Sequence, residues 1–147
     1  MHNISFVIIT KNEEKRIGYV VRNLVKYGEV LVFDDYSTDK TQEIVESLGG
    51  IFITRPTTIK QPDTIEMYTF ARQYIKNDWI FWGCSDHQLP VELLEKMREI
   101  SLQNKYKYVQ VPIFTYLFGD TKNPAHKGYN ARFFKKDCVD FVNNYFH

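Results

Sequence analysis

The stretch that decides the fold is EVLVFDDYSTDKTQEIVESLGG, residues 29–50. Its first five residues, Glu29–Phe33, are apolar and β-rich after the glutamate and predict a strand. Asp39 can open a helix, whose apolar residues recur three and four positions apart (Ile44, Val45, Leu48). Gly49 and Gly50 end that helix. Because residues 51–54 resume β-rich sequence, the stretch predicts a strand–helix–strand unit.

A second unit of the same kind precedes this stretch. Ile4–Thr10 (ISFVIIT) is almost continuously apolar, which is typical of a strand covered on both faces. Asn12 is a suitable helix N-cap, and the helix after it is expected to stop at Gly28. Two such units in succession predict an α/β fold, in which helices flank a mostly parallel, doubly wound sheet.

The rest of the chain continues this pattern and then changes it. A polar loop at residues 55–63 precedes a predicted helix at residues 64–77, a strand at residues 78–83 and a turn at residues 84–88. Pro90 starts another helix, and residues 106–115 predict a strand. Residues 118–128 predict a loop, and Ala131–Phe134 predicts a last strand. No repeat or linker interrupts the chain, so residues 1–147 are interpreted as one domain.

Composition narrows the class of protein. With 147 residues, of which 44% are hydrophobic and 25% charged, the chain has the composition of a soluble globular protein. A net charge of +1 gives no long-range attraction to nucleic acid. The apolar runs are far shorter than the ~20 residues of a membrane helix, and the N-terminus does not resemble a signal peptide. Cys84 and Cys138 form no disulfide framework. We therefore expect a cytoplasmic protein without a transmembrane segment, and peripheral association with the inner face of the membrane stays open.

Aromatic residues are unusually frequent, at 16% of the chain. Such side chains build heavy cores, and they also build platforms for sugars and bases. For the aromatic run after the last predicted helix, we expect a place in the core rather than a sugar platform (Tyr106, Tyr108, Phe114, Tyr116 and Phe118).

Polar side chains follow three of the predicted strands. These groups are Thr10–Glu13, Asp34-Asp35 and Ser85–His87. Ligands of open parallel sheets bind at the carboxyl ends of the strands, so the three groups predict a binding site at one sheet edge. A simpler interpretation is that the aspartates make turns and cap the helices that follow.

Three blocks of sequence carry a resemblance to a known family: VIITKNEEKRI (residues 7–17), VLVFDDYSTDKTQEIVESLG (residues 30–49) and DWIFWGCSD (residues 78–86). In order and spacing they resemble the N-terminal half of family 2 glycosyltransferases, including the subgroup of lipopolysaccharide-core glucosyltransferases. A fourth block, ARFFKK at residues 131–136, is similar to the family's Arg-Leu-Phe-Lys-Lys strand. The resemblance covers nearly the whole chain and implies the GT-A fold, a Rossmann-like fold of nucleotide-diphospho-sugar transferases.

The resemblance also implies a nucleotide-diphospho-sugar donor, with a UDP-sugar favoured, and a glycan or lipid-linked acceptor in cell envelope biosynthesis. Asp34 would accept a hydrogen bond from the uracil N3–H, and Lys11 would place its charge near the diphosphate. Glu13 would reach the base or ribose. The full set of donor-binding residues implied is Thr10, Lys11, Asn12, Glu13, Asp34, Asp35, Ser85 and Asp86.

The family's Asp-x-Asp element, which holds a divalent cation on the diphosphate, falls on Cys84-Ser85-Asp86. Asp86 is retained as a ligand for Mg²⁺ or Mn²⁺, and His87 is a second candidate ligand. Cys84 replaces the first Asp and is a poor ligand for such hard cations. The implied reaction inverts the anomeric carbon, and a base activates the acceptor hydroxyl. In the subgroup this base lies in a His-Glu pair, which His147 approaches without the Glu, so the acceptor-binding part is expected to be abbreviated or missing.

Two alternatives of other classes stay open. A GT-A-like protein that binds a nucleotide sugar or glycan without catalysis would explain Cys84. A signalling receiver would explain the acid pair Asp34-Asp35, but it needs an Asp at the end of the later strand, where this chain has Gly83-Cys84. It also leaves the strand and helix before Glu29 without a role.

Overall fold

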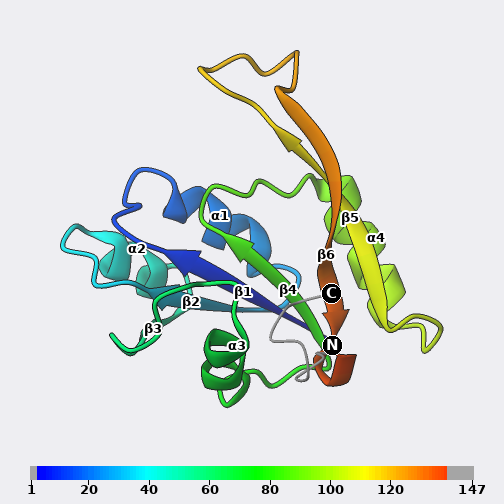
Figure 1. The fold of residues 1–147 in the computed structure, drawn as a ribbon, viewed down its shortest axis with the longest axis horizontal. Helices are drawn as coiled ribbons and strands as arrows, with labels where there is room; N and C mark the ends of the chain where they lie inside the picture. The colour runs from blue at the N-terminus through cyan, green and yellow to red at the C-terminus, as the bar shows by residue number, and fades with distance from the viewer. Residues whose placement is uncertain (1–2, 139–147) are drawn as a thin grey trace.

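The computed structural model describes residues 3–138 and contains six strands, four α-helices and a short 3₁₀ turn within that range (Figure 1). The first half alternates strictly between strand and helix. In chain order the elements are β1 (Ile4–Thr10), α1 (Ile17–Leu24), β2 (Glu29–Asp34), α2 (Thr41–Ser47), β3 (Ile51–Thr54), α3 (Ile65–Arg72), β4 (Trp79–Cys84), α4 (Val91–Ser101), β5 (Tyr108–Thr115), β6 (His126–Lys135) and η1 (Lys136–Cys138).

The six strands form one sheet in the order β3-β2-β1-β4-β6-β5. Strands β3, β2, β1 and β4 are parallel, whereas β6 runs antiparallel to both β4 and β5. The predicted α/β fold with a mostly parallel sheet is therefore confirmed. Because β1 lies between β2 and β4, both of its edges are hydrogen-bonded, and all seven of its residues are buried.

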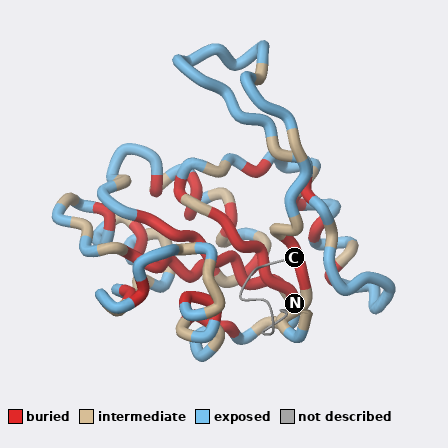
Figure 2. The backbone as a smooth tube through the Cα atoms, viewed as in Figure 1, coloured by how far each residue is buried: buried red, intermediate tan, exposed pale blue. Residues whose placement is uncertain are grey.

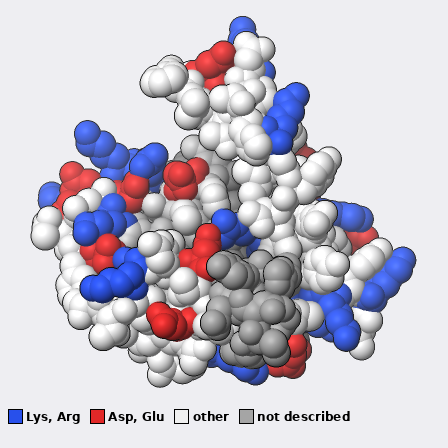
Figure 3. Space-filling view, in the orientation of Figure 1, with Lys and Arg blue, Asp and Glu red and all other residues white. Residues whose placement is uncertain are grey.

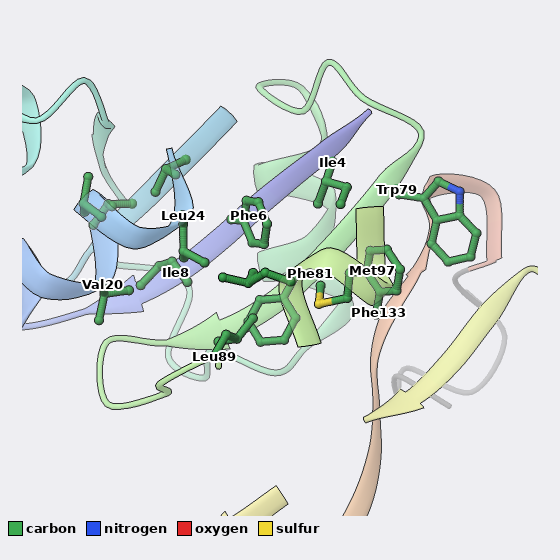
Figure 4. Close-up of a cluster of buried hydrophobic side chains, with 14 of the residues drawn as sticks. Ile4, Phe6, Ile8, Val20, Leu24, Trp79, Phe81, Leu89, Met97 and Phe133 are labelled. Atoms are coloured by element: carbon green, nitrogen blue, oxygen red, sulfur yellow. The ribbon is translucent and has the colours of Figure 1, made fainter. Parts of the chain in front are cut away.

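Helices cover both faces of the parallel strands and create two cores. Alternate residues of β1 point to opposite faces. Phe6 and Ile8 join the core formed with α1, α2 and α4, whereas Val7 and Ile9 join the core formed with α3. Figure 4 shows the first core, in which Trp79 stacks on Phe133 with ring centroids 4.5 Å apart. Red, buried backbone is accordingly concentrated in the central strands in Figure 2.

Strands β5 and β6 extend away from this body as an antiparallel hairpin, which we call the arm and define as residues 108–135 (Figure 1). The predicted last strand, Ala131–Phe134, is too short, because β6 starts at His126. Residues 126–130 carry no apolar pattern that would predict a strand, and their pairing with Val111–Thr115 makes them one. The expectation that the aromatic run lies in the core is wrong. All five side chains are exposed, because Tyr108 and Phe114 lie on the face of β5 opposite to the one that packs with α4, and the other three lie outside the strands (Tyr106, Tyr116 and Phe118).

The predicted helix start at Asn12 is also wrong, since α1 begins at Ile17. Asn12 has a left-handed backbone, with φ at +50°, which a helix N-terminus does not accommodate. Its N–H and those of the two glutamates after it donate to side chains of the loop that follows β2 and of Thr41, the first residue of α2. A long-range partner therefore replaces the local helix. No helix of the described residues is long and apolar enough to cross a membrane.

Candidate functional site

The three polar strand ends predicted from the sequence lie at one edge of the sheet. Thr10 pairs with Asp34 across β1 and β2, and Ile9 pairs with Cys84 across β1 and β4. The Ser85 N–H donates to the Ile9 carbonyl at 3.1 Å, so the chain leaves β4 directly beside the end of β1. The arrangement is that of parallel α/β sheets, in which the loops after the strands meet at the carboxyl edge.

The loop after β1 and the loop after β2 are interlocked by hydrogen bonds. The Asn12 N–H donates to Ser37 Oγ at 2.7 Å, and the Asn12 side-chain oxygen accepts from the Thr38 N–H at 2.8 Å. One residue on, the Glu13 N–H donates to Thr41 Oγ1 at 2.9 Å. A similar exchange links Glu14 to the Asp39–Lys40 backbone and side chain. Asn12 therefore holds the two loops together rather than capping a helix. Asp39 does both, because its Oδ2 accepts from the Glu14 N–H and its Oδ1 accepts at 3.0 Å from the N–H of Thr41, the first residue of α2.

Asp34 is 1% exposed, and its carboxylate belongs to this loop structure. One oxygen accepts from the Ser37 N–H at 2.7 Å, and the other accepts from the Ser37 hydroxyl. Buried carboxylates need such partners, because an unpaired one would be costly. The resemblance implied that Asp34 contacts a base, and in this structure both of its oxygens are engaged by Ser37 within the loop.

Asp35 is the carboxylate that faces outward at the end of β2. Its Oδ2 lies 3.0 Å from the Arg55 guanidinium and 3.4 Å from Lys11 Nζ. The hydrogen bond from Arg55 is the main reason that the pKa of Asp35 lies below its usual value. Asp35 Oδ1 has no hydrogen-bond partner among residues 3–138, and it is therefore an available acceptor.

Arg55 is a site residue that the sequence interpretation missed. It is buried, and its Nη1 donates to the Ile59 carbonyl at 3.0 Å, which fixes the guanidinium beside Asp35. Its Nε has no partner in the described chain, and neither has the buried hydroxyl of Thr10. Arg55 directly follows the third strand, so it is a fourth polar strand end that the same rule could have identified.

The end of β4 carries the second part of the site. The His87 Nδ1 accepts from the Cys84 N–H at 3.1 Å, and the His87 N–H donates to the Cys84 carbonyl at 3.0 Å. Gly83 permits this close turn, because a Cβ there would lie 2.9 Å from His87 Nδ1. Burial lowers the pKa of His87 and raises the pKa of the Cys84 thiol, so both side chains stay neutral near pH 7.

Cys84, Asp86 and His87 offer ligand atoms within 4.8 Å of one another, which is close enough for one cation. Their chemistry favours Asp86 alone. The Cys84 thiol is held protonated, and His87 Nδ1 already accepts a hydrogen bond. Asp86 is exposed, and a carboxylate oxygen is the ligand that Mg²⁺ and Mn²⁺ prefer. The residues therefore fit a hard divalent cation held by one carboxylate and by oxygens that the protein does not supply.

Arg16 binds Glu13 in the loop after β1, and its charge interacts with that of Asp86 in the loop after β4. Its guanidinium binds both oxygens of Glu13, at 2.7 and 2.6 Å, so Glu13 is held inward rather than left free. The hydrogen bond with Glu13 is the main cause that raises the pKa of Arg16, and the charge of Asp86 adds to it. Ser85 is buried, and of the predicted set only Lys11, Asp35 and Asp86 present charged groups that are free to turn toward a ligand.

A second ion pair, which the sequence interpretation also missed, joins the body to the arm. Arg132 of β6 binds both oxygens of Asp63, at 3.0 and 3.3 Å, and Asp63 accepts from the Trp82 indole N–H at 3.0 Å. Arg132 lies in the ARFFKK block, but its partner comes from a loop 69 residues away, which no local pattern indicates. The predicted candidate His147 lies outside the described residues.

The profile of the family described as "Glycosyl transferase family 2" matches residues 5–146. An uncharacterized glycosyltransferase of Rickettsia bellii is 34% identical over 146 residues, which cover 95% of this chain and 48% of the relative. One from Rickettsia typhi is 31% identical over 149 residues, covering 97% and 50% respectively. The chain thus spans about half the length of the curated relatives that it matches.

Solved structures share the fold. Mannosyl-3-phosphoglycerate synthase from Rubrobacter xylanophilus superposes with a TM-score of 0.60 at 14% identity, over 74% of this chain and 40% of that enzyme. Glucosyl-3-phosphoglycerate synthase from Mycobacterium tuberculosis, in complex with uridine diphosphate, gives 0.56 at 22% identity, over 74% and 43%. These likenesses establish the GT-A fold that the sequence predicted.

Proposed function

This chain belongs to glycosyl transferase family 2, and from that premise we propose that it transfers a sugar from a nucleotide-diphospho-sugar to a glycan or lipid-linked acceptor. The observation that carries the proposal is the outward-facing set of Lys11, Asp35 and Asp86 on three interlocked strand ends. The acceptor class includes cell envelope glycans, as in the lipopolysaccharide-core subgroup that the sequence resembles.

Asp35, rather than Asp34, would recognise the base. Arg55 keeps the Asp35 carboxylate ionised, and its Oδ1 can accept the N3–H of a uracil. Asp34 would act indirectly, because its hydrogen bond from the Ser37 N–H holds the turn that positions Asp35. A uridine nucleotide also occupies the M. tuberculosis enzyme named above. A UDP-sugar is therefore the donor that we expect.

Asp86 and Lys11 would face the diphosphate. Lys11 is exposed at the end of β1 and carries its charge toward the same edge as Asp35. A divalent cation, Mg²⁺ or Mn²⁺, would be held by Asp86 and by phosphate oxygens of the donor, and when bound it would stabilise charge on the leaving diphosphate. Cys84 and His87 would shape this turn without contributing ligands.

The proposed reaction inverts the anomeric centre. An oxygen of the acceptor hydroxyl forms a bond to the anomeric carbon from the face opposite the diphosphate. The bond from that carbon to the diphosphate oxygen breaks, the nucleoside diphosphate leaves with the electron pair, and a base takes the hydroxyl proton. We assign no base among residues 3–138. The residues described above bind and orient the donor.

Binding of UDP and UDP-glucose, measured by calorimetry with and without MnCl₂, tests the proposal. Asp35→Ala should weaken binding about tenfold or more in both conditions, because it removes a charge-assisted acceptor. Asp86→Ala should remove only the part of the affinity that MnCl₂ adds. Asp120→Ala, in the exposed loop of the arm, is the matched control and should bind as the wild type does. The proposal fails if no nucleotide sugar binds in either condition.

A second candidate is a GT-A-like protein that binds a nucleotide sugar without transferring it, and Cys84 in the Asp-x-Asp position favours it. The two differ in turnover. Release of UDP from UDP-sugars that depends on added acceptor glycans or glycolipids indicates a transferase, whereas binding without release across sugars and acceptors indicates the non-catalytic protein.

A further inference from the structure

The arm rises from the same edge of the sheet as the candidate site. Strand β6 runs antiparallel to β4 and pairs with it only from Phe81 back to Trp79, opposite Phe133–Lys135. The earlier half of β6 therefore continues beyond the end of β4, where Cys84 and Asp86 lie. Figure 1 shows the hairpin extending well past the helices. A surface on the arm is thus next to the place where a donor would bind.

One face of the arm is aromatic and exposed. In β5, Val109 and Val111 point toward the core with α4, so the alternate residues Tyr108 and Phe114 point to the other face. Cross-strand pairing puts Tyr129 opposite Pro112 and Lys127 opposite Phe114, on that same face. Tyr129 is 75% exposed, and Phe118 in the connecting loop is fully exposed. We call these exposed side chains of the arm the aromatic face: Tyr108, Phe114 and Tyr129 on the strands, together with Tyr116, Leu117 and Phe118 of the connecting loop.

The arm and its flanking residues carry a net positive charge, in contrast to the rest of the chain. Residues 105–136 contain seven lysines and arginines and one acid, Asp120, which is a net +6 in a chain of net +1. The rest of the chain is therefore net −5. Lys122 and Lys127 form no ion pair within the described part of the chain. Basic side chains at the tip and along the arm are visible in Figure 3.

We propose that the arm rests on an anionic membrane surface, with the aromatic face at the level of the lipid headgroups. Tyrosine and phenylalanine beside lysine are the side chains that favour this interface, and each lysine near an anionic leaflet adds attraction. A second copy of the chain is a poorer occupant, because two such regions, each of net +6 over residues 105–136, repel each other. A neutral glycan would leave the basic charge without a role.

This inference rests on the proposed function for its purpose, since a lipid-linked acceptor would then reach the donor edge from the membrane. The binding itself is independent of any nucleotide sugar. The two proposals can therefore fail separately. If the protein binds vesicles but no nucleotide sugar, the membrane role of the arm stands and the proposed transferase function fails. If it binds a nucleotide sugar but no vesicles, only the membrane role of the arm fails.

Sedimentation of the full chain with phosphatidylglycerol–phosphatidylcholine vesicles tests the proposal. Binding should be at least tenfold stronger than to pure phosphatidylcholine, and it should fall as NaCl is raised. Phe114→Ser with Phe118→Ser, and separately Lys122→Glu with Lys127→Glu, should each lower the partition coefficient at least tenfold. Matched controls on the body are Tyr19→Ser with Leu102→Ser, and Lys26→Glu with Lys76→Glu, all exposed residues that should leave it unchanged.

Equal binding to neutral and anionic vesicles, or arm variants that bind as the wild type does, would overturn the proposal. Analytical ultracentrifugation of the same proteins adds a second readout. A dimer that dissociates when Phe114 and Phe118 are changed would assign the aromatic face to a second copy instead. Unchanged thermal unfolding of the arm variants shows that a lost interaction is not lost folding.

Discussion

The body and the arm contain the same kinds of side chain, which are buried in the body and mostly exposed in the arm. Every residue of β1 is buried, whereas in β5 only Val111 is. The two strands are both rich in β-branched and aromatic residues, so their composition does not explain the difference. Helices on both faces cover β1, whereas α4 packs on one face of β5, at Val109 and Val111. An aromatic residue is therefore a core residue only where the architecture brings a second layer to it.

The largest difference between the regions should appear when the same substitution is made in each. Phe6→Ala empties a fully buried site in the core with α1 and should lower the free energy of unfolding by about 3–5 kcal/mol. Phe114→Ala on the arm should change it by less than about 0.5 kcal/mol. Urea unfolding followed by circular dichroism measures both. Equal losses would mean that the arm is packed as tightly as the body.

The second-largest difference in stability should appear between two aspartates that make similar turns, one in each region. Asp34 accepts from Ser37 in the body, and Asp120 accepts from the N–H groups of Lys122 and Asn123 in the arm, at 2.9 and 3.1 Å. Asp34→Ala removes the acceptor for the half-buried N–H and hydroxyl hydrogen of Ser37 and should cost about 1–3 kcal/mol in urea unfolding. In Asp120→Ala water can replace the lost partner, and a cost of similar size there would contradict this account.

The junction between the regions should give a smaller effect. Asp63→Asn keeps an acceptor for the Trp82 indole and removes the paired charge that binds Arg132. Because the Asp63 side chain is about half exposed, we expect a loss of about 1 kcal/mol that shrinks in 1 M NaCl. Asp137→Asn removes the exposed pair with Arg72 and is the control. A larger loss that does not respond to salt would place the stabilisation in packing instead of charge.

The smallest effect should depend on pH. Burial lowers the pKa of His87 in the folded protein below the 6.5 of the unfolded chain, so the neutral form favours folding. This contribution is complete above pH 6.5 and is lost as the pH falls through the folded pKa. Urea midpoints should decline from pH 7.5 to pH 5.5, and less so in His87→Gln. His126→Gln, which changes an exposed histidine of the arm, is the matched control, and a slope reduced as much there as in His87→Gln would contradict this account.

Much of the body could be predicted from the sequence, because local pattern and burial agree there. Ile4–Thr10 is an apolar run and is a strand covered on both faces, as expected. Prediction failed where distant partners decide. Asn12 has the side chain of a helix cap, but its hydrogen bonds go to the loop after β2, 25 and 26 residues along the chain. Phe114 has the side chain of a core residue, and only the extent of the helices shows that it is exposed.

The location of the candidate site could be predicted from the sequence, but the side chains that face outward there could be predicted only in part. The rule that the carboxyl ends of parallel strands meet at one edge predicted that the loops after β1, β2 and β4 lie together, and they do. It did not distinguish Asp34 from Asp35, because adjacent residues at a strand end turn to opposite sides, and only one of them stays outside. Asp63 acts through a partner in another element, so sequence spacing alone does not identify it, whereas Arg55 directly follows β3 and the same rule would have included it.

The position of β1 has a consequence for how the protein is made. This strand is synthesised before both of its neighbours in the sheet, and its second edge stays unpaired until β4, at residues 79–84, has been made. At ordinary rates of translation, the fifty residues between Asp34 and Cys84 take about 3–10 s. During that interval an apolar strand has one open edge, which is the form in which nascent chains aggregate or recruit chaperones.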